Sequence, residues 1–274
     1  MEWIVLIIVG LIAGTFGSLL GLGGGIIVVP ALLILSTTLG ILAGITPQVA
    51  VGTSLLIMIF TGLSSTLAYM KQGKVDYKSG LLFFCGSGPG ALVGVWLNRF
   101  LEVEPFMIYF GIFMIIVSAV LFIRPYLKPR PLSEKGMKYP YTDELGVERV
   151  YGYRPVLAIM IAFFVGMLSG LFGIGGGSLM VPAMIILFHF PPHMAVATSM
   201  FMILLSALTS SISHIVLGNV NWLYALALIP GAYIGGIAGA AINRRLSGNA
   251  LLLALRIFLI IAAIRLIYQG MSGA

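Results

Sequence analysis

The sequence predicts an all-α polytopic membrane protein built from two inverted-topology repeats. Of its 274 residues, 60% are hydrophobic and only 8% are charged, against about 25% charged in a typical soluble domain. The apolar residues form long runs separated by short loops, and the runs of the first half recur in the second. The basic residues gather in loops that the positive-inside rule assigns to one side of a membrane.

Each half is expected to hold a glycine-broken helix hairpin followed by three transmembrane helices. In the first half the apolar runs predict helices over about 3–19, 26–39, 47–70, 79–98 and 105–123. In the second half they predict helices over about 155–171, 178–190, 193–217, 222–243 and 249–268. The chain therefore divides into a first transmembrane repeat (1–123), a charged loop (124–154) and a second transmembrane repeat (155–274).

The duplication is visible in the residues themselves. Residues 14–31 align without gaps on 166–183, with nine of the 18 positions identical. The shared core is a Gly-x-Gly-Gly-Gly segment, at 21–25 and again at 173–177, followed by Pro-Ala. Residues 47–54 align on 192–199, and Pro-Gly-Ala at 89–91 recurs at 230–232. Three matches in the same order indicate an internal repeat.

The basic loops predict that the two halves have opposite orientations. Lys71, Lys74 and Lys78 follow the third segment, seven Lys and Arg lie in 124–154, and Arg244 with Arg245 follow the ninth segment. We expect all of these to be cytoplasmic. The uncharged loop 218–221, which is the counterpart of the first lysine loop, then lies outside. Equivalent loops on opposite sides make an inverted repeat.

Each glycine break must turn the chain back within the membrane. The first broken pair spans 37 residues, from 3 to 39, and would be about 55 Å long as a single helix. The hydrocarbon core is only about 30 Å thick. The pair is therefore a hairpin, made either of two short spans or of a re-entrant pair.

The glycine breaks are the first candidate binding site. Backbone at membrane depth must be hydrogen-bonded or line a cavity. The helix after each break presents free N–H groups and the positive end of its dipole, which suits an anion. Two inverted copies would face each other near the midplane. Tight packing around a sharp turn is the alternative role. The predicted substrate-binding glycines are Gly23, Gly24, Gly25, Gly175, Gly176 and Gly177.

The second candidate is a pair of hydroxyl dipeptides, Thr53-Ser54 and Thr198-Ser199, each about two turns into a long helix. Their hydroxyls can donate to an anion without burying a charge. The alternative is that they bond to their own helix or link helices. We include all four among the predicted substrate-binding residues.

The third candidate is a set of rarer polar residues, for which packing or a place at the membrane edge is favoured over contact with substrate. They are His189, His193, His214, Asn98, Asn243 and Arg256. Arg256 lies inside its helix, where a charge is costly unless it extends to the interface or is paired.

Acidic residues are missing from the predicted helix interiors. All eight lie near span ends or in loops, so no intramembrane proton relay or cation site is expected. No catalytic residue, metal ligand or cofactor is predicted, and the basic charge is explained by topology without nucleic acid. An anion leaving a negative interior gains about 2.3 kcal/mol per charge per 100 mV, so voltage alone could drive its export.

At these motifs the sequence resembles the TauE/SafE family of sulfite exporters and related permeases. The resemblance rests on the two Gly-x-Gly-Gly-Gly…Pro-Ala segments, on Ala-Val-Gly-Thr-Ser at 50–54 with Ala-Val-Ala-Thr-Ser at 195–199, and on the two Pro-Gly-Ala segments. It covers nearly the whole chain. It implies a multi-pass permease of a prokaryotic-type plasma (inner) membrane, for which the charge pattern makes the central loop cytoplasmic.

The substrate that the resemblance implies is a small sulfur-containing anion, such as sulfite or an organosulfonate, moved outward. The alternatives are another small anion or an organic acid, and less favourably a metal cation. The expected partners are this anionic substrate and the lipid bilayer, and a homo-oligomer is compatible with the sequence.

Overall fold

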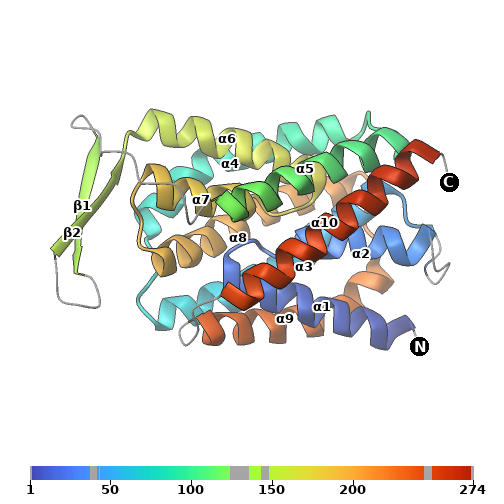
Figure 1. Ribbon diagram of the computed structural model, residues 1–274, viewed down its shortest axis with the longest axis horizontal. Helices are drawn as coiled ribbons and strands as arrows, with labels where there is room; N and C mark the ends of the chain where they lie inside the picture. The colour runs from blue at the N-terminus through green and yellow to red at the C-terminus, as the bar shows by residue number, and fades with distance from the viewer. Residues whose placement is uncertain are drawn as a thin grey trace.

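The computed structural model describes residues 2–37, 42, 44–123, 136–142, 148–243 and 249–272. In these residues the chain forms ten helices and a β-hairpin (Figure 1). The first half contains α1 (Glu2–Leu20), α2 (Gly25–Thr37), α3 (Pro47–Lys71), α4 (Tyr77–Asn98) and α5 (Val103–Ile123). The second contains α6 (Pro155–Phe172), α7 (Gly177–Leu187), α8 (Pro192–Val216), α9 (Trp222–Asn243) and α10 (Asn249–Ser272). Seven of them, namely α1, α3, α4, α5, α6, α8 and α9, are long and apolar enough to cross a membrane. The predicted all-α polytopic fold is confirmed.

The helices that follow the glycine breaks are too short to cross a membrane. α2 has 13 residues and α7 has 11, which gives lengths of about 20 and 17 Å against a core of about 30 Å. α2 packs back against α1 and α3, and α7 against α8 and α6. These lengths favour the re-entrant form of the hairpins. α7 ends three residues before the predicted end at 190, and the predicted end of α2 at 39 lies outside the described residues.

The two halves of the sequence are interlocked. The first helix of each half packs along the fourth helix of the other, α1 on α9 and α6 on α4. Glycines bring these helices into backbone contact: a Cβ added to Gly90 would lie 2.0 Å from the Phe163 carbonyl oxygen, and one on Gly235 would lie 2.4 Å from that of Leu11. Small residues allow such close approach in membrane helices.

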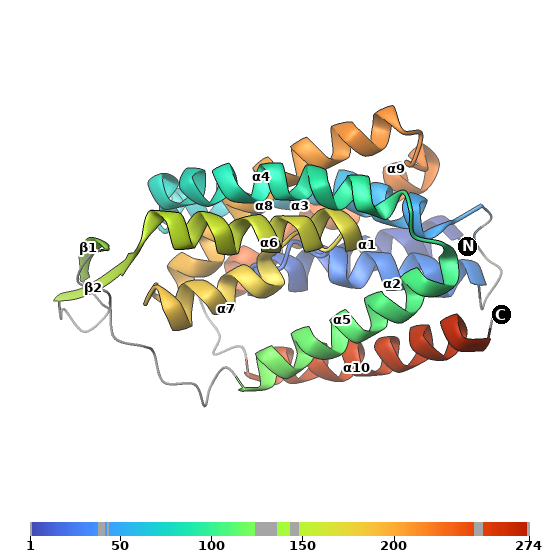
Figure 2. The ribbon, with the colours of Figure 1, turned by 90° about the horizontal axis from the view of Figure 1, so that it is seen from above.

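We divide these helices into two groups, each of which draws on both halves of the chain and is built around one of the two close pairs, α1 with α9 or α6 with α4. The α1 group comprises α1, α2, α3 and α9, and the α6 group comprises α4, α6, α7 and α8. The groups meet mainly where α3 packs on α8. α5 and α10 pair with each other along one side of the bundle, as Figure 2 shows.

The contacts also fix which residues of α4 and α9 are equivalent. Gly86, Gly90 and Gly94 approach the carbonyls of Ile159, Phe163 and Met167, whereas Gly231, Gly235 and Gly239 approach those of Ile7, Leu11 and Thr15. Since residues 7, 11 and 15 align with 159, 163 and 167 through the glycine breaks, Gly86 is the counterpart of Gly231. The alignment of Pro-Gly-Ala at 89–91 on 230–232 is therefore wrong by four residues, one helical turn.

The charged central segment contains a β-hairpin that the sequence analysis missed. β1 (Met137–Thr142) pairs antiparallel with β2 (Glu148–Tyr153), and Tyr139 lies opposite Tyr151. Tyrosines at alternate positions of both strands carry the period of two typical of a strand. Pro140 in the middle of β1 argues against a strand from sequence, although an edge strand tolerates proline.

Tyrosines anchor the hairpin to one end of the bundle (Figure 1). The Tyr151 hydroxyl donates to Oδ2 of Asp76 at 2.9 Å, and the hydroxyls of Tyr153 and Ser79 lie 2.7 Å apart. The Gly152 N–H donates to the Phe188 carbonyl at 2.9 Å. The ring of Tyr151 lies 4.3 Å from that of Phe190, centroid to centroid. The hairpin is thus held on the start of α4 and on the segment after α7.

Replacing Tyr151 with phenylalanine should loosen the hairpin, because the bond to a carboxylate is lost. Hydrogen bonds to charged groups contribute about 1.5–3 kcal/mol, so trypsin cleavage after the exposed Arg149 should accelerate at least about tenfold. Tyr141→Phe is the control, since Tyr141 contacts Tyr151 only through its ring. Equal cleavage rates in the two variants would contradict the anchoring role of the Tyr151 hydroxyl.

The anchoring should also withstand mildly alkaline pH. Burial, with a further contribution from Asp76, raises the pKa of Tyr151 above its ordinary value. The neutral hydroxyl is therefore favoured in the folded state. Its contribution to the stability of the anchored hairpin is fully present below the ordinary tyrosine pKa of about 10. It is lost only as pH rises through the higher folded value, so protection from trypsin in the parent protein should stay constant from about pH 7 to 9.

Candidate functional site

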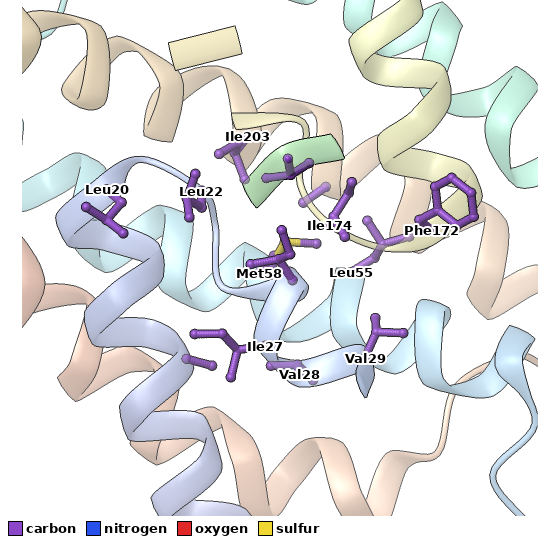
Figure 3. Close-up of a cluster of buried hydrophobic side chains, with 14 of the residues drawn as sticks. Leu20, Leu22, Ile27, Val28, Val29, Leu55, Met58, Phe172, Ile174 and Ile203 are labelled. Carbon is purple, nitrogen blue, oxygen red and sulfur yellow. The ribbon is translucent and has the colours of Figure 1, made fainter. Parts of the chain in front are cut away.

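The two glycine breaks meet in the middle of the bundle. The residues inside them, Leu22 and Ile174, gather with Met58 and Ile203 in a buried apolar cluster (Figure 3). A Cβ on Gly23 would lie 3.0 Å from the Met58 sulfur, and one on Gly175 would lie 2.7 Å from the same atom. Met58 and Ile203 occupy equivalent positions of α3 and α8, so equivalent residues of both halves contribute to this cluster.

Positive φ angles explain why each break is made of glycine. In the first break φ is 72° at Gly21, 87° at Gly23 and 94° at Gly24. The second break repeats this, with 70° at Gly173, 80° at Gly175 and 68° at Gly176. Only glycine adopts this region at little cost. The sequence prediction that helices end and restart here is confirmed, since α1 ends at Leu20 and α2 begins at Gly25.

The first residue of each short helix touches the opposite break. A Cβ on Gly25 would lie 2.0 Å from the Gly173 carbonyl oxygen, and one on Gly177 would lie 1.8 Å from that of Gly21. Real Cβ atoms do not come so close to an oxygen. Gly25 and Gly177 are therefore required by contact between the breaks and not by their own φ angles.

The two predicted serines link the long helices α3 and α8 to the breaks. Ser54 Oγ donates to the Gly173 carbonyl at 2.9 Å, and Ser199 Oγ donates to the Gly21 carbonyl at 2.8 Å. Both side chains are fully buried. Each serine thus bonds to the break of the other half of the sequence and joins the α1 group to the α6 group.

The two predicted threonines each hold the turn before a following helix. Thr53 holds the turn before α9 and Thr198 the turn before α4, in each case a helix of the same group. Thr53 Oγ1 accepts from the Asn221 N–H at 3.0 Å, and Thr198 Oγ1 accepts from the Asp76 N–H at 3.1 Å. Both side chains are buried. Because each hydroxyl accepts in these bonds, it keeps its own hydrogen to donate.

Backbone donors at both breaks have no protein acceptor. Within the part of the chain that the structure describes, this holds for the N–H groups of Gly24, Gly25 and Ile26 at the start of α2. It holds equally for those of Gly175, Gly176 and Ser178 around the start of α7. Free N–H groups at a helix start attract anions. The site therefore offers donors of the kind that an anion needs.

Two asparagines that the sequence analysis treated as packing residues position the breaks. Asn98 Nδ2 donates to the Leu171 carbonyl at 2.8 Å, and Asn243 Nδ2 donates to the Leu19 carbonyl at 2.7 Å. Each carbonyl lies just before a break, where a helix ending leaves carbonyls without a helical partner. The sequence did contain a signal for this role, because the two asparagines end corresponding predicted helices of the two repeats.

Tyr69 and His214 occupy equivalent positions of α3 and α8 but differ in bonding. The Tyr69 hydroxyl donates to the Ser18 carbonyl at 2.9 Å. His214 is fully buried, and neither ring nitrogen has a partner among the described residues. Arg256 is remote from the breaks: it donates to the Leu121 carbonyl on α5 and lies over the ring of Phe122.

The sequence is similar along nearly its whole length to one protein family and to several membrane proteins. Residues 6–266 match the family described as sulfite exporter TauE/SafE. The "Probable membrane transporter protein YunE" of Bacillus subtilis (strain 168) is 54% identical over 270 residues, which are 98% of this chain and 99% of that protein. "Probable membrane transporter protein MJ0441" of Methanocaldococcus jannaschii is 29% identical over 257 residues, or 89% and 87% of the two chains. A "Probable membrane transporter protein" of Xylella fastidiosa (strain Temecula1) is 27% identical over 245 residues, or 89% and 85%. The chain therefore belongs to the sulfite exporter TauE/SafE family and is a membrane transporter.

Proposed function

We propose that this transporter moves a small sulfur-containing anion, such as sulfite or an organosulfonate, out of the cell across the plasma (inner) membrane. The observation that carries the proposal is the meeting, in the middle of the bundle, of two glycine breaks that each have three N–H groups without an acceptor among the described residues. The family description, sulfite exporter, supports the choice of substrate. The binding groups would be the backbone at 23–25 and 175–177 with Thr53, Ser54, Thr198 and Ser199.

The hydroxyls at the site would act in two ways. Thr53 and Thr198 have a hydrogen free to donate to the anion. Ser54 and Ser199 donate theirs to carbonyls of the opposite breaks, so they would turn from carbonyl to anion as substrate binds. Binding would then weaken the two hydrogen bonds that join the α1 group to the α6 group. This links occupancy of the site to movement of the groups.

The proposed topology is an inverted repeat with the central segment in the cytoplasm. In Figure 1, α1 starts at the end of the bundle marked N, and α6 starts at the opposite end, next to the hairpin, which supports opposite orientations of the two halves. Lys71, Lys74 and Lys78 lie around the turn that carries Asp76, to which Tyr151 of the hairpin is bonded. The positive-inside rule then places the hairpin end in the cytoplasm.

A flux assay in proteoliposomes tests the substrate. Vesicles containing the protein and loaded with sulfite or methanesulfonate should release the anion when the interior is made negative. For a monovalent anion that crosses alone, about 2.3 kcal/mol per 100 mV shifts the equilibrium concentration ratio about fiftyfold. Protein-free vesicles are the control. Release of acetate or of a divalent metal cation, with neither sulfur anion moving, would show that an alternative substrate is correct.

A further inference from the structure

The two glycine breaks differ in the side chains beside them. In the alignment of 14–31 on 166–183, Ser169 of the second half replaces Gly17 of the first, and Ser178 replaces Ile26. The glycines of the Gly-x-Gly-Gly-Gly core are the same in both copies, with Ile174 in place of Leu22. In the other direction Gly170 replaces Ser18, whose hydroxyl already donates to the Gly236 carbonyl. The second break therefore has two hydroxyls that the first one lacks.

At the first break, backbone fills the space next to the glycines. The Gly17 carbonyl accepts from the N–H groups of Leu22 at 2.7 Å and Gly23 at 3.2 Å. A Cβ added to Gly17 would lie 2.3 Å from the Gly24 nitrogen. The last turn of α1 thus packs directly on the break, and no side chain can reach the Gly24 N–H from position 17.

At the second break, a hydroxyl-bearing side chain lies at the corresponding place. The Cβ atom of Ser169 is 3.6 Å from the position of a Cβ on Gly176. Ser169 is 1% exposed, and its Oγ has no hydrogen-bond partner among the described residues. A buried hydroxyl without a partner is destabilising. Thr66, Ser210 and Ser211 also have one, but Ser169 lies beside a free N–H group of a helix start, where a bound anion would satisfy both donors.

Ser178 gives a second, independent indication. It lies in the first turn of α7, is fully buried, and its Oγ also has no partner in the described part of the chain. Its own N–H is among the unpaired backbone donors. At the equivalent position of α2 the side chain is the apolar Ile26, which is equally buried.

We propose that the oxyanion binds at the second break, held by the hydroxyls of Ser169 and Ser178 and by the N–H groups of Gly176 and Ser178. The first break is then its structural counterpart, which packs against the second and carries no substrate of its own. An oxyanion suits the site because its several oxygens can accept from backbone and hydroxyl donors together. This inference rests on the proposed function, keeps its substrate, and narrows its two symmetric sets of binding groups to the second break.

The test compares Ser169→Ala and Ser178→Ala with Ser64→Ala in the proteoliposome assay. Ser64 is a matched control, because it is a buried serine of a spanning helix whose hydroxyl donates to a carbonyl of its own helix, that of Thr61. The KM for sulfite should rise about tenfold in each of the first two variants and about a hundredfold in the double variant, with kcat changed less. In the Ser64 variant it should change less than twofold.

Thermal stability gives a readout that does not depend on flux. Without anion, Ser169→Ala and Ser178→Ala should melt no lower than the parent protein, because the lost hydroxyls have no partners. Sulfite should raise the Tm of the parent and of Ser64→Ala by binding the folded state, and should raise it little in the two site variants.

The outcomes separate the two proposals. If sulfite is transported and Ser169→Ala and Ser178→Ala behave like Ser64→Ala in both KM and Tm, the assignment to the second break is wrong and the proposed function stands. If the parent protein neither transports sulfite or methanesulfonate nor is stabilised by them, the proposed function fails and the assignment with it.

Discussion

Replacing Gly177 with alanine is expected to destabilise the protein strongly and to abolish transport. The new Cβ would lie 1.8 Å from the Gly21 carbonyl oxygen, and it would also crowd Ser199 Oγ at 2.8 Å. That oxygen is backbone in the opposite break and accepts the Ser199 hydrogen bond, so it cannot move without disturbing both breaks. Overpacking usually costs about 1–3 kcal/mol and sometimes more, and contact with backbone places this case at the upper end.

The measurement is the yield of monodisperse protein in detergent and its Tm, followed by sulfite flux. A loss of about 3 kcal/mol should lower Tm by about 10 °C, and Gly25→Ala should behave alike, since its Cβ would meet the Gly173 carbonyl oxygen at 2.0 Å. Gly88→Ala is the control, because the three atoms nearest to a Cβ at this helical glycine all belong to the Phe84 ring, which can shift, and none is backbone. Unchanged Tm and flux in Gly177→Ala would show that the two breaks do not touch as described.

The breaks were predictable from sequence because their signal is local. Consecutive glycines inside an apolar run favour a break in a helix. At Gly23, Gly24, Gly175 and Gly176 the backbone has the positive φ angles that end the preceding helix. The predicted hydroxyls, Ser54 and Ser199, do lie at the breaks. The sequence could not show that each bonds the break of the other half, because that choice depends on how the halves interlock in space.

The sequence alignment of α4 on α9 is displaced by one helical turn for a physical reason. Glycines recur every four residues along the contact faces, at Gly86, Gly90 and Gly94 and again at Gly231, Gly235 and Gly239. A helix with this spacing presents nearly the same face after a shift of one turn, so a short match such as Pro-Gly-Ala does not fix the register. The carbonyls that the glycines approach do fix it.

Interlocking also decides which parts of the protein can move against each other. If the two halves of the sequence rocked as rigid bodies, the backbone contacts of α1 with α9 and of α4 with α6 would have to break. If the α1 group moves against the α6 group, these contacts persist. The contacts that change are those between α3 and α8 and the hydrogen bonds of Ser54 and Ser199 to the opposite breaks. We therefore expect the two helix groups to be the moving bodies.

Two engineered disulfides in a Cys85→Ser background distinguish these alternatives. Gly62→Cys with Leu204→Cys joins α3 to α8, where a Cβ on Gly62 would lie 3.2 Å from the Leu204 Cβ, a few tenths of an ångström short of the usual disulfide range. Oxidation of this pair should reduce sulfite flux at least about tenfold, and a reducing agent should restore it, because the link joins the two groups.

The control pair is Ser87→Cys with Ser206→Cys. These hydroxyls lie 2.8 Å apart between α4 and α8, so the link joins the two halves of the sequence but stays within the α6 group. Its oxidation should leave flux within about twofold of the reduced protein. If oxidising the control pair stops flux as well, the halves of the sequence are the moving bodies, because both links join the two halves. The glycine contacts between α4 and α6 would then have to open in every transport cycle, at the cost of exposing closely packed backbone.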